Sequence, residues 1–118
     1  MEKRNIILEK TYQFSLFIIS IYKYLYEEKK EYVLSKQLLR SGTSIGANSE
    51  EASVGVSRKD FINKYQIAYK EAKESHYWLR LLRDSNYLED QKARAAIVMC
   101  EDILRILNAI LKTSKMRN

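Results

Sequence analysis

The polar residues between Leu38 and Ala52 are the first place in the chain where side-chain chemistry could gather. The stretch LLRSGTSIGANSEEA combines two glycines with hydroxyl, amide, guanidinium and carboxylate groups. At 100° per residue, four of its polar residues fall on one stripe of a helix, beside an apolar stripe. Because such groups can exchange hydrogen bonds with a neighbouring helix, we expect a structural polar network against the helix of residues 58–83. The four residues are Arg40, Ser44, Asn48 and Glu51.

Gly42 and Gly46 indicate that this stretch makes a close helix contact. A glycine inside a helix costs roughly 1 kcal/mol relative to alanine, so two so close together suggest that another backbone comes near. Alternatively, residues 41–44 form a break with a helix on either side. We favour one continuous helix, because the chain contains no proline that would enforce a stop.

A second group of side chains could bind phosphates. Four cations and one aromatic residue fall within about a quarter of the circumference of the helix of residues 58–83, roughly opposite its apolar face. This basic stripe suits a nucleic acid, because cations contact phosphates and an aromatic ring can stack on a base. The alternative is an ordinary solvated surface whose cations pair with Asp60 or Glu74. The basic stripe consists of Lys59, Lys70, Lys73, Tyr77 and Arg80.

The opposite flank of the same helix carries Trp78 beside branched apolar residues and two carboxylates. A four-helix monomer would leave this tryptophan partly exposed. Exposed tryptophan with branched neighbours is typical of a subunit contact. We therefore predict a subunit interface made of Ile67, Glu71, Glu74, Trp78 and Leu81.

Catalysis and metal binding are not indicated. Di-iron bundles need several carboxylates and usually Glu-x-x-His motifs on two helices, whereas the single histidine, His76, has no glutamate three residues before it. A ribonuclease-like pairing of Arg and His on one helix also fails, because positions 70–72 are Lys, Glu and Ala. The chain lacks a phosphate-binding glycine loop and a Cys/His cluster. We predict no enzyme, no metal and no cofactor, with His76 at the surface.

Composition narrows the fold class. A chain of 118 residues with 46% apolar residues can build one domain with a real core, and 31% charged residues support a soluble surface. No proline and only three glycines make a turn-rich β fold improbable. The net charge of +6 is concentrated in residues 57–118, which favours an anionic partner such as RNA, DNA or an acidic protein surface. A basic protein without a nucleic-acid role is the alternative.

The single cysteine and the apolar runs bear on localisation. Cys100 cannot form an internal disulfide, and its apolar neighbours predict a buried, inert thiol in a reducing compartment. The N-terminal residues have no long apolar run, so no signal peptide is indicated. Apolar runs such as Leu16–Ile19 are far too short to span a membrane. We predict a cytoplasmic protein without membrane contact.

Helical spacing of apolar residues predicts an antiparallel, up-down-up-down four-helix bundle as a single domain over residues 1–118. The expected helices cover about 5–28, 33–55, 58–83 and 89–113. The charged run Glu27–Glu31 is expected to be a solvated helix end and the first turn, and Ser57 with Asp60 resembles a capping box. The expected core residues are Ile7, Phe14, Phe17, Ile18, Ile21, Leu25, Leu34, Leu38, Ile45, Ala52, Phe61, Tyr65, Ala68, Ala72, Ser75, Leu79, Leu82, Ala93, Ile97, Cys100, Leu104, Leu107 and Leu111.

Three segments resemble a known family. LLRSGTSIGANSEEA (38–52), the region of Phe61 and EAKESHYWLRLL (71–82) resemble the bacterial four-helix bundle family of 23S rRNA-intervening-sequence proteins, over nearly the whole chain. The most specific parts are Arg-Ser-x-x-Ser-Ile-x-x-Asn at 40–48, with Glu51, and Glu-x-x-x-Trp-Leu at 74–79. The chain departs from the family where Ser-Glu at 49–50 replaces a common Ile-Ala and Ser53 replaces a common Gly. These departures affect packing.

The resemblance implies a ring-shaped homopentamer without catalytic residues. Family members are encoded within insertions in bacterial 23S rRNA genes or stand alone. A related branch provides the accessory protein of diversity-generating retroelements, in which a basic pentamer binds a reverse transcriptase and nucleic acid. We therefore expect a homo-oligomer that binds RNA or a ribonucleoprotein through its basic surface. The alternative is a protein-protein adaptor, such as an accessory subunit that docks a reverse transcriptase, with no direct nucleic-acid role.

Overall fold

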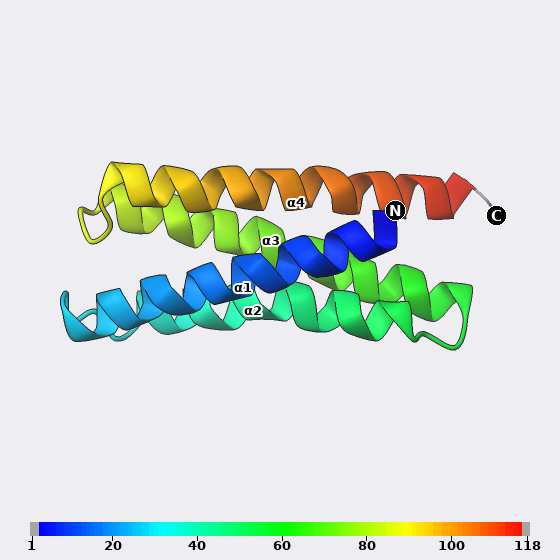
Figure 1. Cartoon of the computed structure of the whole chain (residues 1–118), viewed down its shortest axis with the longest axis horizontal. Coiled ribbons are helices and arrows are strands. Elements are labelled where there is room, and N and C mark those ends of the chain that lie inside the picture. The colour runs from blue at the N-terminus through cyan, green and yellow to red at the C-terminus, as the bar shows by residue number, and fades with distance from the viewer. Residues whose placement is uncertain (1–2, 117–118) are drawn as a thin grey trace.

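The computed structural model describes residues 3–116, which form four helices in antiparallel order (Figure 1). The predicted all-α four-helix bundle is confirmed, and no described residue lies in a strand. The helix bounds differ from the expected ones by at most three residues. The helices are α1 (Lys3–Glu27), α2 (Leu34–Ser53), α3 (Arg58–Asp84) and α4 (Asp90–Met116).

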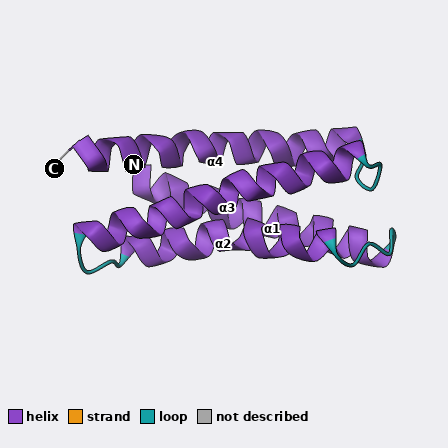
Figure 2. Ribbon diagram, turned by 180° about the vertical axis from the view of Figure 1, so that it is seen from behind, coloured by secondary structure: helices purple, strands orange, loops and turns teal. Residues whose placement is uncertain are grey.

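Each helix packs against its neighbours in sequence, and α1 closes the bundle against α4. Across the described chain, no Cα atom of α1 comes within 8 Å of one in α3, and the same holds for α2 and α4, so the diagonal helices meet only through core side chains. In Figure 1, α1 crosses in front of α3, whereas α3 lies in front in the view from behind in Figure 2. The outward faces of α1 and α3 therefore point to opposite sides of the bundle.

The core forms where the apolar stripes of the four helices meet. The expected core residues are buried, except that Phe17, Leu34, Phe61 and Leu104 are half-buried and pack against its edge. Burying apolar side chains in this way supplies most of the driving force for folding, because each removes apolar surface from water.

α2 is continuous through residues 41–44, so the alternative of a break is wrong. Its hydroxyl groups fold back onto carbonyls of the same helix: Thr43 donates to the Leu39 carbonyl at 2.8 Å, and Ser49 donates to the Ile45 carbonyl at 2.8 Å. These bonds satisfy the hydroxyl groups within α2 and hold their short side chains against the helix, which keeps the helix slim. A narrow helix lets α1 and α3 approach closely on either side.

Glu31 lies just before α2 and is not the solvated residue that the charged run predicts. It is buried, because its carboxylate caps the helix. One oxygen accepts hydrogen bonds from the backbone N–H groups of Val33 and Leu34 at 3.1 and 3.0 Å, and the other accepts from Ser35 at 2.6 Å. Three N–H groups at a helix start have no partner within the helix, so a carboxylate there satisfies them and interacts favourably with the helix dipole.

Replacing Glu31 with alanine is expected to lower the free energy of unfolding by about 1.5 kcal/mol, because three N–H groups lose their acceptor. Equilibrium urea unfolding followed by circular dichroism measures this loss. The matched control is Glu28→Ala, which removes an exposed carboxylate of the same turn. Equal losses from the two changes would show that the cap does not stabilise α2.

The two remaining turns are fixed by polar caps and one apolar anchor. The Ser57 hydroxyl accepts a hydrogen bond from the backbone N–H of Asp60 at 3.0 Å, as the capping pattern predicts. Between α3 and α4, Asn86 adopts a φ of 69°, in the left-handed region that asparagine tolerates better than most residues. Leu88 is buried just after it, which ties this turn to the core.

Candidate nucleic-acid interface

The basic stripe lies on the outward face of α3, and all five of its residues are exposed. Lys70, Lys73, Tyr77 and Arg80 lie within three helical turns of one another. Lys59 is eleven residues before Lys70, about 16 Å away along the helix axis. The stripe therefore consists of one compact group near the middle of the bundle and one distant lysine.

Within the described part of the chain, the two lysines of the compact group have no ion-pair partner. Among the side chains of residues 6–115, neither Lys70 nor Lys73 has a carboxylate partner within 4.0 Å. Glu74, one of the acidic partners considered from the sequence, is instead bound to Arg40. Free cations on an exposed helix face remain available for phosphate groups.

Arg80 is held by its own helix and, through His76, by α4. Its guanidinium lies 5.7 Å from the centre of the Tyr77 ring, and its Nε donates to Nδ1 of His76 at 3.1 Å. His76 Nε2 lies 3.0 Å from Glu101 Oε2 on α4. His76 is half-buried between the two helices, so the expected surface residue is part of a polar contact between α3 and α4. This contact could not be predicted from local sequence, because Glu101 lies 25 residues after His76.

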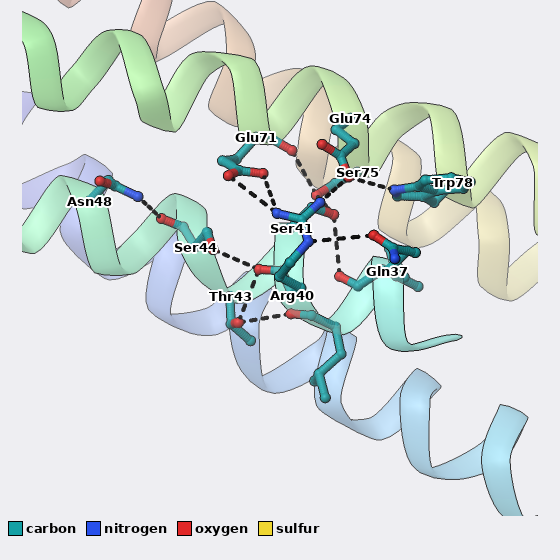
Figure 3. Close-up of polar contacts among 12 residues, drawn as sticks. Gln37, Arg40, Ser41, Thr43, Ser44, Asn48, Glu71, Glu74, Ser75 and Trp78 are labelled. Atoms are coloured by element: carbon teal, nitrogen blue, oxygen red, sulfur yellow. Dashed lines mark hydrogen bonds and ion pairs between the residues drawn. The ribbon is translucent and has the colours of Figure 1, made fainter. Parts of the chain in front are cut away.

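On the other flank of α3, Arg40 of α2 lies between two carboxylates (Figure 3). Its Nη1 donates to Glu71 Oε1 at 3.1 Å, and its Nη2 pairs with Glu74 Oε2. The same Glu74 oxygen accepts a hydrogen bond from the indole N–H of Trp78 at 2.9 Å. The sequence assigned Arg40 to a polar network and the other three residues to a subunit interface, whereas the structure joins all four in one cluster within the chain.

The rest of the expected polar network divides into two kinds of contact. Glu51 crosses to α3 and pairs with Lys64 at 2.9 Å, and its hydrogen bond raises the pKa of Lys64. Ser44 and Asn48 do not reach α3: each donates to a carbonyl four residues earlier in α2, at 2.7 and 2.9 Å. Only the two ends of the predicted stripe therefore link the helices.

A buried contact that the sequence analysis missed links the same two helices. The Ser75 hydroxyl of α3 lies 2.8 Å from the Ser41 hydroxyl of α2 and 2.9 Å from the Glu71 carbonyl. Both serines are fully buried. Ser75 was expected in the core, where it lies. The predicted polar stripe of α2 included Arg40, the residue before Ser41, but not Ser41 itself.

The predicted subunit interface leaves little free surface. Trp78 is half-buried against the core, and its indole N–H is already satisfied by Glu74. Ile67 is half-buried, and Leu81 is 36% exposed. The carboxylates of the set are occupied by Arg40. What remains for a second subunit is a small apolar edge around Leu81 and Trp78.

The single thiol is buried, and the groove between α1 and α4 carries an ion pair. Burial raises the pKa of Cys100 to about 12, and its Sγ lies 3.2 Å from the Ala72 carbonyl. An open groove of about 380 Å³ between α1 and α4 is spanned by an ion pair of Lys10 with Asp102 at 2.8 Å. Among the described residues, no cluster of three or more His, Cys, Asp or Glu could hold a metal ion. In the same part of the chain, no helix is long and apolar enough to cross a membrane.

Comparison with known proteins gives two findings. The model of the family described as 23S rRNA-intervening sequence protein matches residues 3–109. A crystal structure of a protein of unknown function from Bacteroides thetaiotaomicron, described as a member of the S23 ribosomal protein family, is 45% identical and superposes with a TM-score of 0.92. That match covers 94% of this chain and 99% of the other. The chain matches none of the curated proteins.

Proposed function

The chain belongs to the family of 23S rRNA-intervening sequence proteins, and from this premise we propose that it is a non-enzymatic, oligomeric module that binds RNA in the cytoplasm. The observation that carries the proposal is the compact group on α3. Its Lys70 and Lys73 are exposed and have no ion-pair partner in the described chain. The half-exposed ring of Tyr77 lies beside them. Cations of this kind contact phosphates, and the ring offers a stacking surface to an unpaired base.

Assembly strengthens this proposal. A single copy presents only three cations in the compact group, which supports weak binding. Several copies would hold several such groups at a high effective concentration, so that affinity becomes collective. We take the homopentamer of the resemblance as the working assembly. Light scattering coupled to gel filtration, with and without RNA, measures it: a species near five subunits is expected, and a monomer at all concentrations would contradict it.

Reversing the charge of Lys70, Lys73 and Arg80 together to glutamate is expected to weaken RNA binding at least about tenfold at low salt, because the phosphate contacts are lost. Fluorescence anisotropy with a labelled single-stranded RNA measures the affinity. It should also fall less steeply with salt in the variant, since fewer counterions are released.

The control variant reverses Lys36, Lys112 and Lys115, three exposed lysines on other helices, and changes the net charge by the same amount. If both triple variants lose affinity equally, RNA senses only net charge and the stripe is not a site. If neither loses affinity, the RNA-binding proposal is wrong. The alternative of a protein adaptor for a reverse transcriptase then becomes the better account. Arg80, which is held in place by Tyr77 and His76, would then contact a protein surface.

A further inference from the structure

The middle of α1 and the middle of α2 are uncharged in a chain that is otherwise rich in charge. Residues 11–22 and residues 41–49 contain no Asp, Glu, Lys or Arg, although 31% of all residues are charged. Burial in the core explains why charged residues are absent from the inward half of each helix, but not from the outward half. An uncharged outward half on a basic protein needs another explanation.

The two uncharged segments lie side by side. A Cβ added to Gly42 would lie 2.9 Å from Ile18 side-chain atoms, and one added to Gly46 would lie 3.4 Å from the Thr11 carbonyl. The absence of side chains at these glycines brings the two helices together. The outward surfaces of the two segments therefore form one continuous area, which together with the outward residues of α1 from Leu8 to Tyr26, the exposed Glu9 and Lys23 included, we call the α1–α2 face.

The α1–α2 face exposes apolar and aromatic side chains. Tyr12, Leu16 and Tyr26 are 61%, 47% and 42% exposed, and Ile19 is half-buried between them. Their spacing of three, four and seven residues places them on one stripe of the helix. At one end the Tyr26 ring packs edge-on against Tyr32 at 4.7 Å. Tyrosine is enriched where proteins contact each other, because it buries much area at little entropic cost.

We propose that the α1–α2 face binds a second copy of this chain. The proposal rests on the assembly proposed above and names the surface that makes it. Charge favours this occupant: an RNA backbone finds no cation at the centre of the face and only Lys23 near one end, whereas a copy that also carries +6 is repelled by most of this molecule. A second copy experiences the least repulsion where it contacts the uncharged centre of this face, whichever of its own surfaces it presents.

Position and size agree with this occupant. From Leu8 to Tyr26 the stripe is about 27 Å long, and two adjacent helices make the face roughly 20 Å wide. Its area of about 500 Å² is below the roughly 800 Å² per partner of a standard interface, so dissociation on dilution is expected. Since α1 and α3 face opposite sides of the bundle (Figures 1 and 2), a copy bound here leaves the basic stripe exposed.

Cysteine labelling tests the face directly, because the native thiol is buried and its high pKa keeps it protonated at neutral pH. Leu16→Cys and Tyr77→Cys place a thiol at positions of equal exposure in one copy, 47% and 49%. When the concentration of free protein is tenfold above the dissociation constant of the assembly, maleimide is expected to label Leu16→Cys about tenfold more slowly than Tyr77→Cys. After dilution below that constant, the two variants are expected to react equally fast. Equal rates in an assembled sample would overturn the proposal while leaving assembly itself intact.

A second pair of variants keeps the result independent of labelling chemistry. Leu16→Glu is expected to shift the light-scattering mass of the assembly toward one copy, because it buries a charge between subunits. Leu81→Glu, at the edge first predicted as the interface, is expected to leave the mass unchanged. The reverse pattern would assign the contact to α3. If the wild-type protein is a monomer and maleimide labels Leu16→Cys at all concentrations as fast as Tyr77→Cys, a second copy is excluded as the occupant. RNA binding by the basic stripe is tested separately by the charge-reversal variants.

Discussion

Gly42→Ala is expected to lower the free energy of unfolding by about 2 kcal/mol, even though alanine favours a helix by roughly 1 kcal/mol over glycine. The added Cβ would lie 2.9 Å from both Cγ atoms of Ile18 and 3.3 Å from its Cβ. Ile18 is fully buried and branched at Cβ, so it cannot turn away without moving α1. Overpacking of this kind costs typically 1–3 kcal/mol, and here it should exceed the gain in helix propensity.

The same substitution at Gly46 is the matched control and should have the opposite sign. A Cβ there meets its nearest atoms, the carbonyl and hydroxyl oxygens of Thr11, at 3.4 Å, which is close to ordinary contact. The helix gains propensity without a clash, so Gly46→Ala is expected to raise stability by about 0.5 kcal/mol. Urea unfolding of both variants measures the difference. A stabilised Gly42→Ala would show that α1 and α2 are not as closely packed as the structure has them.

The architecture was predictable because it depends on periodic burial. Apolar residues at helical spacing, the lack of proline and the capping serine at Ser57 are all local signals, and each describes one element without knowledge of the others. Glu31 was misassigned for the same reason. Within its charged run it resembles its solvated neighbours, and only the orientation of α2 makes its carboxylate a cap.

The polar contacts were predicted only in part, because the partner of a long side chain depends on how two helices are rotated against each other. The sequence placed Arg40 and Glu51 correctly on the side of α2 that faces α3. It could not show that Ser44 and Asn48, on the same stripe, have side chains too short to leave their own helix. The residue that does form the buried link, Ser41, lies on the core side of that stripe.

Several residues of the predicted subunit interface already have polar partners within one chain. Trp78 beside Glu71 and Glu74 is an unusual combination on a helix surface, and the sequence favoured a subunit contact. Within one chain, however, Arg40 supplies the missing cation and Glu74 supplies the acceptor for the indole. An arginine 31 residues before Glu71 was available in the sequence, but nothing local indicated that it would lie opposite.

Arg40→Glu is expected to lower the free energy of unfolding by about 2 kcal/mol at low salt. The change removes two attractive pairs and adds a third carboxylate to Glu71 and Glu74, and each such surface interaction is worth up to about 1 kcal/mol. Because Arg40 is about half exposed, with its side chain at 48%, salt should screen the repulsion. The loss is therefore expected to shrink markedly near 1 M salt, where the Debye length is about 3 Å.

Two further variants separate this electrostatic effect from a loss of packing. Lys36→Glu makes the same change of charge one turn earlier on α2, at an exposed residue without an ion-pair partner in the described chain, and should cost less than about 0.5 kcal/mol. Adding Glu71→Arg to Arg40→Glu restores an opposite pair between α2 and α3 and should recover part of the stability. A loss at Arg40 that is independent of salt and is not rescued by Glu71→Arg would mean that its aliphatic stem, rather than its charge, holds the two helices together.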